Sequence, residues 1–148
     1  MTATASGRVL IARLGDERVA LAVEAVREVL DAPSVTALPL TPPGVAGQLS
    51  HGAGYLPILD PAILLGVARQ GGAGAALVLQ DVDAALWVDD VEDVWLLAPE
   101  DTHEVPRGVD RRGVLRAILR RGGVVVSQLD PGVLAALALA TLRQEQMQ

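Results

Sequence analysis

The chain has 148 residues, a formal net charge of −6, no cysteine and no phenylalanine. A chain of this length can bury roughly 70% of its unfolded surface in one domain, so it needs neither a disulfide nor a metal for stability. Its acidic balance gives no overall attraction to nucleic acid or anionic lipid. With two Trp and one Tyr as the only aromatic residues, the core must consist of Val, Leu, Ile and Ala.

The chain opens with a pattern of short strands. Val9–Leu14 is an apolar run, and Gly15–Glu17 supplies turn residues after it. The segment Val19–Val23 alternates apolar residues with small ones, which is typical of a half-buried strand. The apolar spacing then changes to three through Val26 and Val29, which predicts a helical turn.

Further apolar runs bounded by glycine-rich turns follow. Tyr55–Leu59 and Ala76–Leu79 are predicted strands, and Gln70–Gly74 is the expected link between two halves of the chain. Val114–Leu119 and Val124–Leu129 flank an Arg-Arg-Gly-Gly sequence, which predicts a hairpin. Short strands at regular spacing with one C-terminal helix favour a mainly β fold made of two small antiparallel barrels.

The two halves of the chain resemble each other. Residues 19–30 recur as residues 84–95, with five apolar and two acidic positions repeated. Leu59-Asp60-Pro61 recurs as Leu129-Asp130-Pro131. Asp can cap free amides and Pro suits the first helical position, so both triplets predict helix starts. Each half is therefore expected to hold several strands, a short helical turn and a closing helix.

We expect the protein to be soluble and cytoplasmic. The first seven residues contain no apolar signal core. The longest apolar stretch, Val133–Leu142, is far shorter than the ~20 residues that span a bilayer.

Few residues suggest catalysis or metal binding. His51 and His103 lie outside spacings such as HExxH, so we expect no metal and no cofactor and interpret both as loop histidines. Ser50, His51 and Asp60 are a remote candidate for a hydrolase triad, although no GxSxG sequence is present. The favoured interpretation is a protein that is not an enzyme.

Two clusters of charge have alternative interpretations. Asp89-Asp90 and Glu92-Asp93 lack the DxDxDG pattern of a Ca²⁺ loop, so they indicate a solvated face on a helical turn or a contact for a basic partner. Half of the basic residues lie within fifteen positions without aromatic neighbours, which favours a charged hairpin edge over a nucleic-acid groove. They are Arg107, Arg111, Arg112, Arg116, Arg120 and Arg121.

The order of these motifs resembles the CheW-like family over roughly residues 8 to 140. The chain has counterparts of the family's opening strand and LGD-E turn, its V-x-x-V-x-E-V stretch, its Pro-rich crossing, its V-P-V/I-V-D-L strand, its V-D-x-V-x-x-V segment and its closing strand with helix. They are LGDERVALAV (Leu14–Val23), VREVL (Val26–Leu30), TALPLTPPGVAG (Thr36–Gly47), LPILDP (Leu56–Pro61), ALWVDDVEDV (Ala85–Val94) and VVVSQLDPGVLAAL (Val124–Leu137).

The resemblance implies a single CheW-like domain over residues 1–148, with two five-stranded SH3-like barrels on a common core. Subdomain one would span approximately residues 16–70 and subdomain two approximately residues 75–130. The N-terminal strand and the C-terminal helix would pack across them.

The resemblance also implies an adaptor without an active site, which couples a chemoreceptor to a CheA-type histidine kinase. By position, Val26 and Gly47 match the kinase-binding side, and Ala85, Val91 and Val94 match the region that faces the receptor tip. The alternative for the valines is that they are core residues. On this basis Gly47→Asp is expected to weaken kinase binding with the fold largely intact.

One motif departs from the family. Where the family has N-L-R-G, this chain has Ser50, His51, Gly52 and Ala53. An Arg offers five fixed donors that can organise a junction between subdomains or partners, and Gly offers none. The departure puts the receptor partner in doubt. The alternative is a divergent scaffold for pilus-based motility or for another, non-chemotactic regulator.

Overall fold

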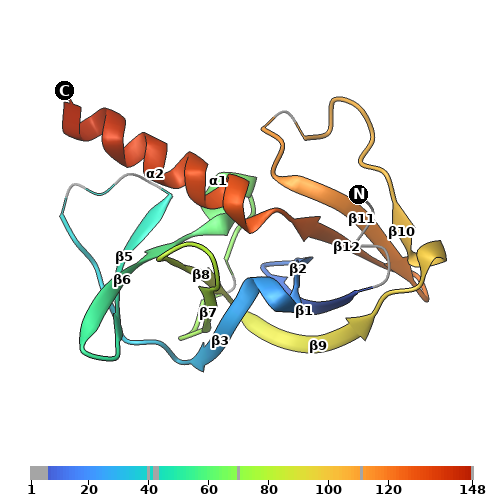
Figure 1. Ribbon diagram of the computed structural model, residues 1–148, viewed down its shortest axis with the longest axis horizontal. Helices are drawn as coiled ribbons and strands as arrows, with labels where there is room; N and C mark the ends of the chain where they lie inside the picture. The colour runs from blue at the N-terminus through green and yellow to red at the C-terminus, as the bar shows by residue number, and fades with distance from the viewer. Residues whose placement is uncertain (1–6, 40, 42–43, 70, 111, 148) are drawn as a thin grey trace.

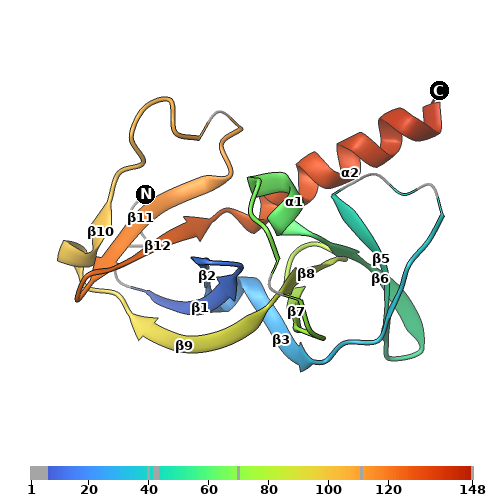
Figure 2. The same ribbon diagram turned by 180° about the vertical axis from the view of Figure 1, so that it is seen from behind.

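The computed structural model describes residues 7–39, 41, 44–69, 71–110 and 112–147, with side chains described up to Leu139. Residues 1–6, Gln70 of the expected link and Arg111 of the Arg cluster lie outside the described residues. Figure 1 and Figure 2 show two β lobes side by side, with α1 and the start of α2 near the line between them and the rest of α2 extending past the lobe that contains β5 and β6. The elements are β1 (Arg8–Leu14), β2 (Glu17–Ala22), η2 (Val23–Ala25), β3 (Val26–Asp31), β4 (Val35–Thr36), β5 (Val45–His51), β6 (Gly54–Leu59), α1 (Pro61–Leu65), β7 (Ala75–Leu79), β8 (Ala85–Val88), β9 (Asp90–Leu96), η3 (Pro99–Asp101), β10 (Thr102–His103), β11 (Leu115–Arg121), β12 (Val124–Leu129) and α2 (Pro131–Met147).

The strands form two six-stranded sheets that exchange their first two strands. The sheet of lobe A has the order β10-β11-β12-β2-β1-β9, and the sheet of lobe B has the order β3-β7-β8-β6-β5-β4. β1 and β2 come from the first half of the chain but lie in the same sheet as β9–β12 of the second half. β7 and β8 come from the second half but lie in the same sheet as β3–β6 of the first half. Each half of the chain therefore builds part of both lobes.

Strand registers show that the sequence repeat is a structural repeat. In lobe A, Gln128 of β12 pairs with Ala20 of β2 in a parallel register. In lobe B, Ile58 of β6 pairs with Ala85 of β8 in the same way. Ile58 and Gln128 are equivalent in the 70-residue repeat, and Ala20 and Ala85 in the 65-residue repeat. The two halves consequently share the same sequence of strands and the same crossing point.

Three apolar clusters hold the structure together. One lies within lobe A and includes Ile11 and Leu119. A second lies within lobe B and includes Leu49 and Ile58. The largest is shared by both lobes and the helices, and Leu134 of α2 is fully buried in it. Because side chains alternate along a strand, β1 can contribute to its own lobe on one face and to the shared core on the other.

Both predicted helix starts and the predicted hairpin are present in the structure. Asp60 Oδ1 accepts a hydrogen bond from Ala62 N at 3.1 Å, and Asp130 Oδ1 accepts one from Val133 N at 3.2 Å. Both Asp-Pro pairs therefore begin helices, as predicted. The hairpin of β11 and β12 and the mainly β class are also confirmed.

Several expectations need correction. The sheets have six strands rather than five, and each contains one parallel pair. The boundary expected near residues 70–75 separates the repeats but not the lobes, because β7 and β8 pair with strands of the first half. The predicted helical turn is limited to Val23–Ala25, while Val26 and Val29 lie in β3. The backbone hydrogen bonds between β3 and β7 outweigh the spacing of three, and β-branched valine suits a strand.

Candidate functional site

Arg69 lies at the contact between the two lobes and binds two carboxylates. Its Nη2 donates to Asp60 Oδ1 at 2.8 Å and to the Trp87 carbonyl oxygen at 2.6 Å. Its Nη1 donates to Asp89 Oδ1 at 3.1 Å, and its guanidinium carbon lies 4.8 Å from the Trp87 ring centroid. A planar guanidinium suits this task because its donors leave in several fixed directions. We call Arg69, Asp60, Trp87, Asp89 and Gly15 the inter-lobe joint.

The joint reaches lobe A through Asp89, which follows β8 where the chain crosses between lobes. Asp89 Oδ2 accepts a hydrogen bond from Gly15 N at 2.6 Å, and Asp89 N donates to the Arg13 carbonyl oxygen at 2.9 Å. Gly15 has φ 64°, and a Cβ there would collide with the Ala68 carbonyl oxygen. Only glycine therefore allows the β1–β2 turn of lobe A to rest on the segment that carries Arg69.

The end of α1 determines where Arg69 lies. Gly66 ends α1 in the left-handed conformation with φ 72°, and its N–H bonds back into the helix. The chain then turns so that Arg69 returns to Asp60, the residue that caps the same helix. In the second half the equivalent of Gly66 is Ala136, and α2 continues to Met147. The position equivalent to Arg69 holds Leu139, so the second half has no counterpart of this Arg.

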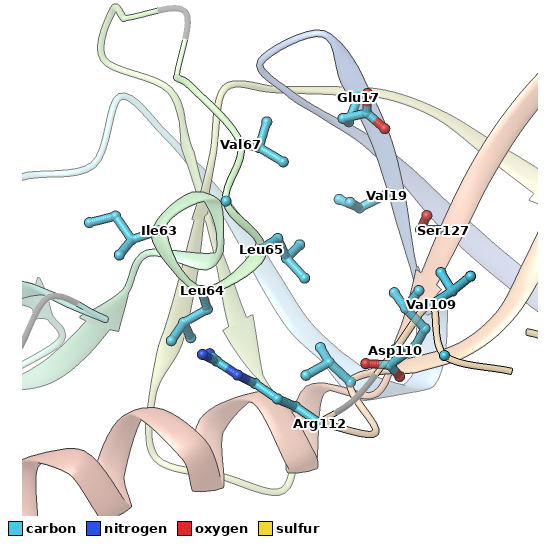
Figure 3. Close-up of a pocket in the computed structure, with 14 residues that line it drawn as sticks. Glu17, Val19, Ile63, Leu64, Leu65, Val67, Val109, Asp110, Arg112 and Ser127 are labelled. Atoms are coloured by element: carbon cyan, nitrogen blue, oxygen red, sulfur yellow. The ribbon is translucent and has the colours of Figure 1, made fainter.

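A groove of about 550 Å³ runs between α1 and lobe A. Figure 3 shows Ile63 and Leu65 on the α1 side of the groove, and Val19 of β2 and Val109 on the side of lobe A. Ile63 is 52% exposed and Val109 is 61% exposed, so the groove presents apolar surface to its surroundings. Arg112 extends toward α1 in the same view and is a charged group at the groove.

The edges of each sheet meet through side chains. In lobe B, β3 is one edge strand and β5 is the neighbour of the other edge strand, β4. His51 Nε2 at the end of β5 is 2.5 Å from Oε1 of Glu28 in β3. In lobe A, Arg121 of β11 donates to the Leu96 carbonyl oxygen at 2.6 Å, where β9 is the edge strand. The Arg121 guanidinium also lies 4.8 Å from the Trp95 ring centroid. These contacts close each curled sheet across its open side.

Arg121 also changes the acidity of a neighbouring carboxyl group. Arg121 Nη2 donates to Asp101 Oδ2 at 2.8 Å, and the Ala98 backbone N–H donates to the same oxygen at 3.0 Å. The hydrogen bond from Arg121 and then that from Ala98 lower the pKa of Asp101 below its ordinary value, because both favour the charged carboxylate.

The residues assigned to the kinase side lie in lobe B. Val26 is partly buried in β3 and packs against the shared core. Gly47 is buried in β5 with φ 152°, and a Cβ there would collide with the Thr36 carbonyl oxygen. Gly47 is therefore a backbone requirement of the bulge in β5, and Gly47→Asp is expected to disturb the fold itself.

The residues assigned to the receptor side have different environments. Ala85 is fully buried within lobe B, so it contributes no exposed surface in this structure. Val91 of β9 is partly buried against the shared core, and Val94 of the same strand is 50% exposed. Of these three residues, Val94 is the one that a partner can contact without rearrangement.

The positions of Ser50, His51 and Asp60 rule out the hydrolase alternative. His51 ends β5 and pairs with Gly54 at the start of β6, whereas Asp60 follows the end of β6. Six residues of strand at about 3.3 Å each separate their positions by roughly 20 Å, which is far beyond hydrogen-bond reach. His51 contacts Glu28, and Asp60 binds Arg69. Ser50, His51 and Asp60 therefore share no site here.

The divergent motif forms the tip of a hairpin. Gly52 and Ala53 make the turn between β5 and β6, and both are exposed. Gly52 has φ 60° with nothing within 4 Å of a Cβ, so the site is open but favours glycine. The loss of Arg at this position does not leave the inter-lobe junction without an Arg, because Arg69 occupies it. No motif in the sequence pointed to Arg69, since its carboxylate partners lie nine and twenty residues away.

The charged clusters also differ from their expected setting. Asp90, Glu92 and Asp93 lie in strand β9 rather than on a helical turn, and Asp89 directly precedes this strand. Glu92 Oε1 lies 2.9 Å from Arg18 Nε. Arg112, Arg116 and Arg120 are exposed, while Arg121 is partly buried by its contacts. Among the described residues, no three His, Asp or Glu side chains gather as metal ligands would. No helix within the described part of the chain is both long and apolar enough to cross a membrane.

Comparison with known proteins identifies the class of this fold. The family model of the CheW-like domain matches residues 8–138. The chain therefore belongs to the CheW-like domain family.

The scaffolding protein TtCheW from Thermoanaerobacter tengcongensis has a similar structure, with a TM-score of 0.75 and 19% sequence identity over 84% of this chain and 89% of that chain. No curated protein matches the sequence. The two-lobed, mainly β architecture agrees with the pair of SH3-like barrels expected from the motifs.

Proposed function

We propose that this protein is a cytoplasmic chemotaxis adaptor that couples a chemoreceptor to a CheA-type histidine kinase and has no catalytic activity of its own. The observation that carries the proposal is the match to the CheW-like domain over residues 8–138. The likeness to a CheW scaffolding protein supports the same architecture. The adaptor would act through protein surfaces with apolar centres and polar rims.

The two partner surfaces would lie on different lobes. The kinase side is assigned to lobe B through Val26, and the receptor side to β9 of lobe A through Val91 and Val94. The exposed fraction of Val94, 50%, supports a role in contact with a partner. This arrangement would let one chain hold two partners at the same time.

The experiment is a binding study with two purified partners from the organism that makes this protein. They are the regulatory domain of its CheA-type kinase and the cytoplasmic tip of its chemoreceptor. Val94→Glu should weaken receptor binding and leave kinase binding unchanged, because a charge enters one exposed apolar contact. Val125→Glu is the matched control, since Val125 has the same 50% exposure in lobe A but lies on β12. Val26→Ala should weaken kinase binding.

The results separate the possible outcomes. Binding of neither partner by the parent chain would contradict the adaptor role, whatever the fold. Kinase binding without receptor binding would favour a divergent scaffold, for instance one in pilus-based motility. Equal effects of Val94→Glu and Val125→Glu would show that β9 is not the receptor surface.

A further inference from the structure

The two lobes need a fixed relation if one partner on lobe A is to influence another on lobe B. The shared core supplies apolar contact, which is not directional. Directional contact between the lobes comes from the inter-lobe joint, where one guanidinium binds a carboxylate before α1 and a carboxylate at the crossing from β8 to β9. Asp89 then holds the β1–β2 turn of lobe A through Gly15 N.

Burial makes the joint specific. The side chain of Arg69 is 21% exposed, that of Asp60 is 11% exposed and that of Asp89 is 2% exposed. Charges that are removed from water interact strongly and tolerate few geometries, because each unmade hydrogen bond is costly. The Trp87 ring beside the guanidinium further limits the positions that Arg69 can adopt.

We propose that Arg69 is a positioning residue that fixes the orientation of lobe A relative to lobe B and, through Gly66 and Val67, the shape of the groove beside α1. It contacts no partner itself. The consequence for signalling rests on the proposed adaptor function: coupling between a receptor on lobe A and a kinase on lobe B requires Arg69, whereas binding of either partner alone does not.

The chain offers a matched control in Arg121. Arg121 makes the same three kinds of contact as Arg69, with a carboxylate, a carbonyl oxygen and a Trp ring. Its partners, however, all belong to lobe A or the segment directly after β9. Arg121→Gln therefore removes comparable contacts without touching the relation between the lobes.

The orientation can be measured with two spin labels, because the chain has no cysteine of its own. Tyr55→Cys in lobe B and Val125→Cys in lobe A are equivalent positions of the repeat and are 68% and 50% exposed. Double electron–electron resonance then gives the distance distribution between the lobes. We expect Arg69→Gln to shift or widen this distribution and Arg121→Gln to leave it as in the parent.

An unchanged distribution in Arg69→Gln would overturn the proposal, as would an equal change in Arg121→Gln. If Arg69→Gln does not fold, Arg69→Lys serves instead, since it keeps the charge but loses the planar fork. A distribution in Arg69→Lys identical to the parent's would also overturn it.

A second measurement tests the signalling consequence. Receptor-dependent stimulation of the kinase should be lost in Arg69→Gln while the affinity for each isolated partner stays near the parental value. Retained stimulation together with a changed distance distribution would contradict the link to coupling. If the parent chain binds no kinase but Arg69→Gln still changes the distance distribution, the adaptor function is refuted. The proposed role of Arg69 in fixing the orientation of the lobes is then retained.

Discussion

His51 and Arg121 occupy equivalent positions in the two halves of the chain, seventy residues apart, and each closes the open side of its own sheet. His51 does so through one contact with Glu28, between side chains that are 25% and 43% exposed. Arg121 does so through Asp101, the Leu96 carbonyl oxygen and the Trp95 ring. The repeat thus conserves the place of closure while the chemistry of closure differs.

This difference predicts unequal effects on stability. His51→Ala should lower the free energy of unfolding by less than about 1 kcal/mol, because a single polar contact between partly exposed side chains contributes little. Arg121→Ala should lower it by more, since it removes several contacts at once. Urea denaturation of both variants tests the order. A larger loss for His51→Ala would mean that the contact with Glu28 is not a surface pair of ordinary strength.

Acid should weaken the closure of lobe A. The pKa of Asp101 is lowered from 3.8 by the hydrogen bond from Arg121, so the folded state binds that proton less readily than the unfolded chain does. Its stabilising contribution is therefore present above the ordinary pKa and is lost as the pH falls through the lowered value. The difference in stability between the parent and Asp101→Asn should shrink as the pH falls below about 4. A difference that stays constant on acidification would show that Asp101 does not act through its charge.

Gly47 should resist substitution for reasons of backbone geometry. Its φ of 152° is unfavourable for side chains, and the Thr36 carbonyl oxygen occupies the space that a Cβ needs. Gly47→Ala should lower the free energy of unfolding by about 2 kcal/mol or more. Gly54→Ala in the same hairpin is the control, because nothing lies within 4 Å of its Cβ position and it has no positive φ. Similar midpoints for the two variants in thermal unfolding would contradict this account.

Gln128 is a polar residue in an apolar setting. It is 1% exposed, and its Oε1 has no hydrogen-bond partner within the described part of the chain. The equivalent position in lobe B holds Ile58. Gln128→Met should therefore keep or raise the midpoint of thermal unfolding, because it removes an unsatisfied acceptor at similar volume. Gln128→Glu should lower the midpoint strongly, because it buries a charge. A marked loss in Gln128→Met would indicate that the amide makes contacts essential to the lobe.

Local features of the sequence predicted much of the secondary structure. The Asp-Pro pairs begin helices because capping depends on neighbouring residues, and Arg-Arg-Gly-Gly forms a hairpin because the turn needs glycine. The repeat at 65 and 70 residues was also visible. By contrast, the spacing of three through Val26 and Val29 predicted a helical turn where the chain forms β3. A local period could not reveal that this segment pairs with β7, which comes from the second half of the chain.

The composition of the core, the two similar halves, the helix starts and the family membership could all be inferred from the order of residues along the chain. The packed fold was needed to learn which lobe each strand joins, that Arg69 lies between the lobes in place of the missing motif Arg, and that Ala85 is buried while Val94 is exposed. The two kinds of feature differ in the separation along the chain of the residues that form them. Caps and turns form between neighbours, whereas the parallel pair of Gln128 with Ala20 and the bond of Asp89 to Gly15 join residues that only the packed fold brings together.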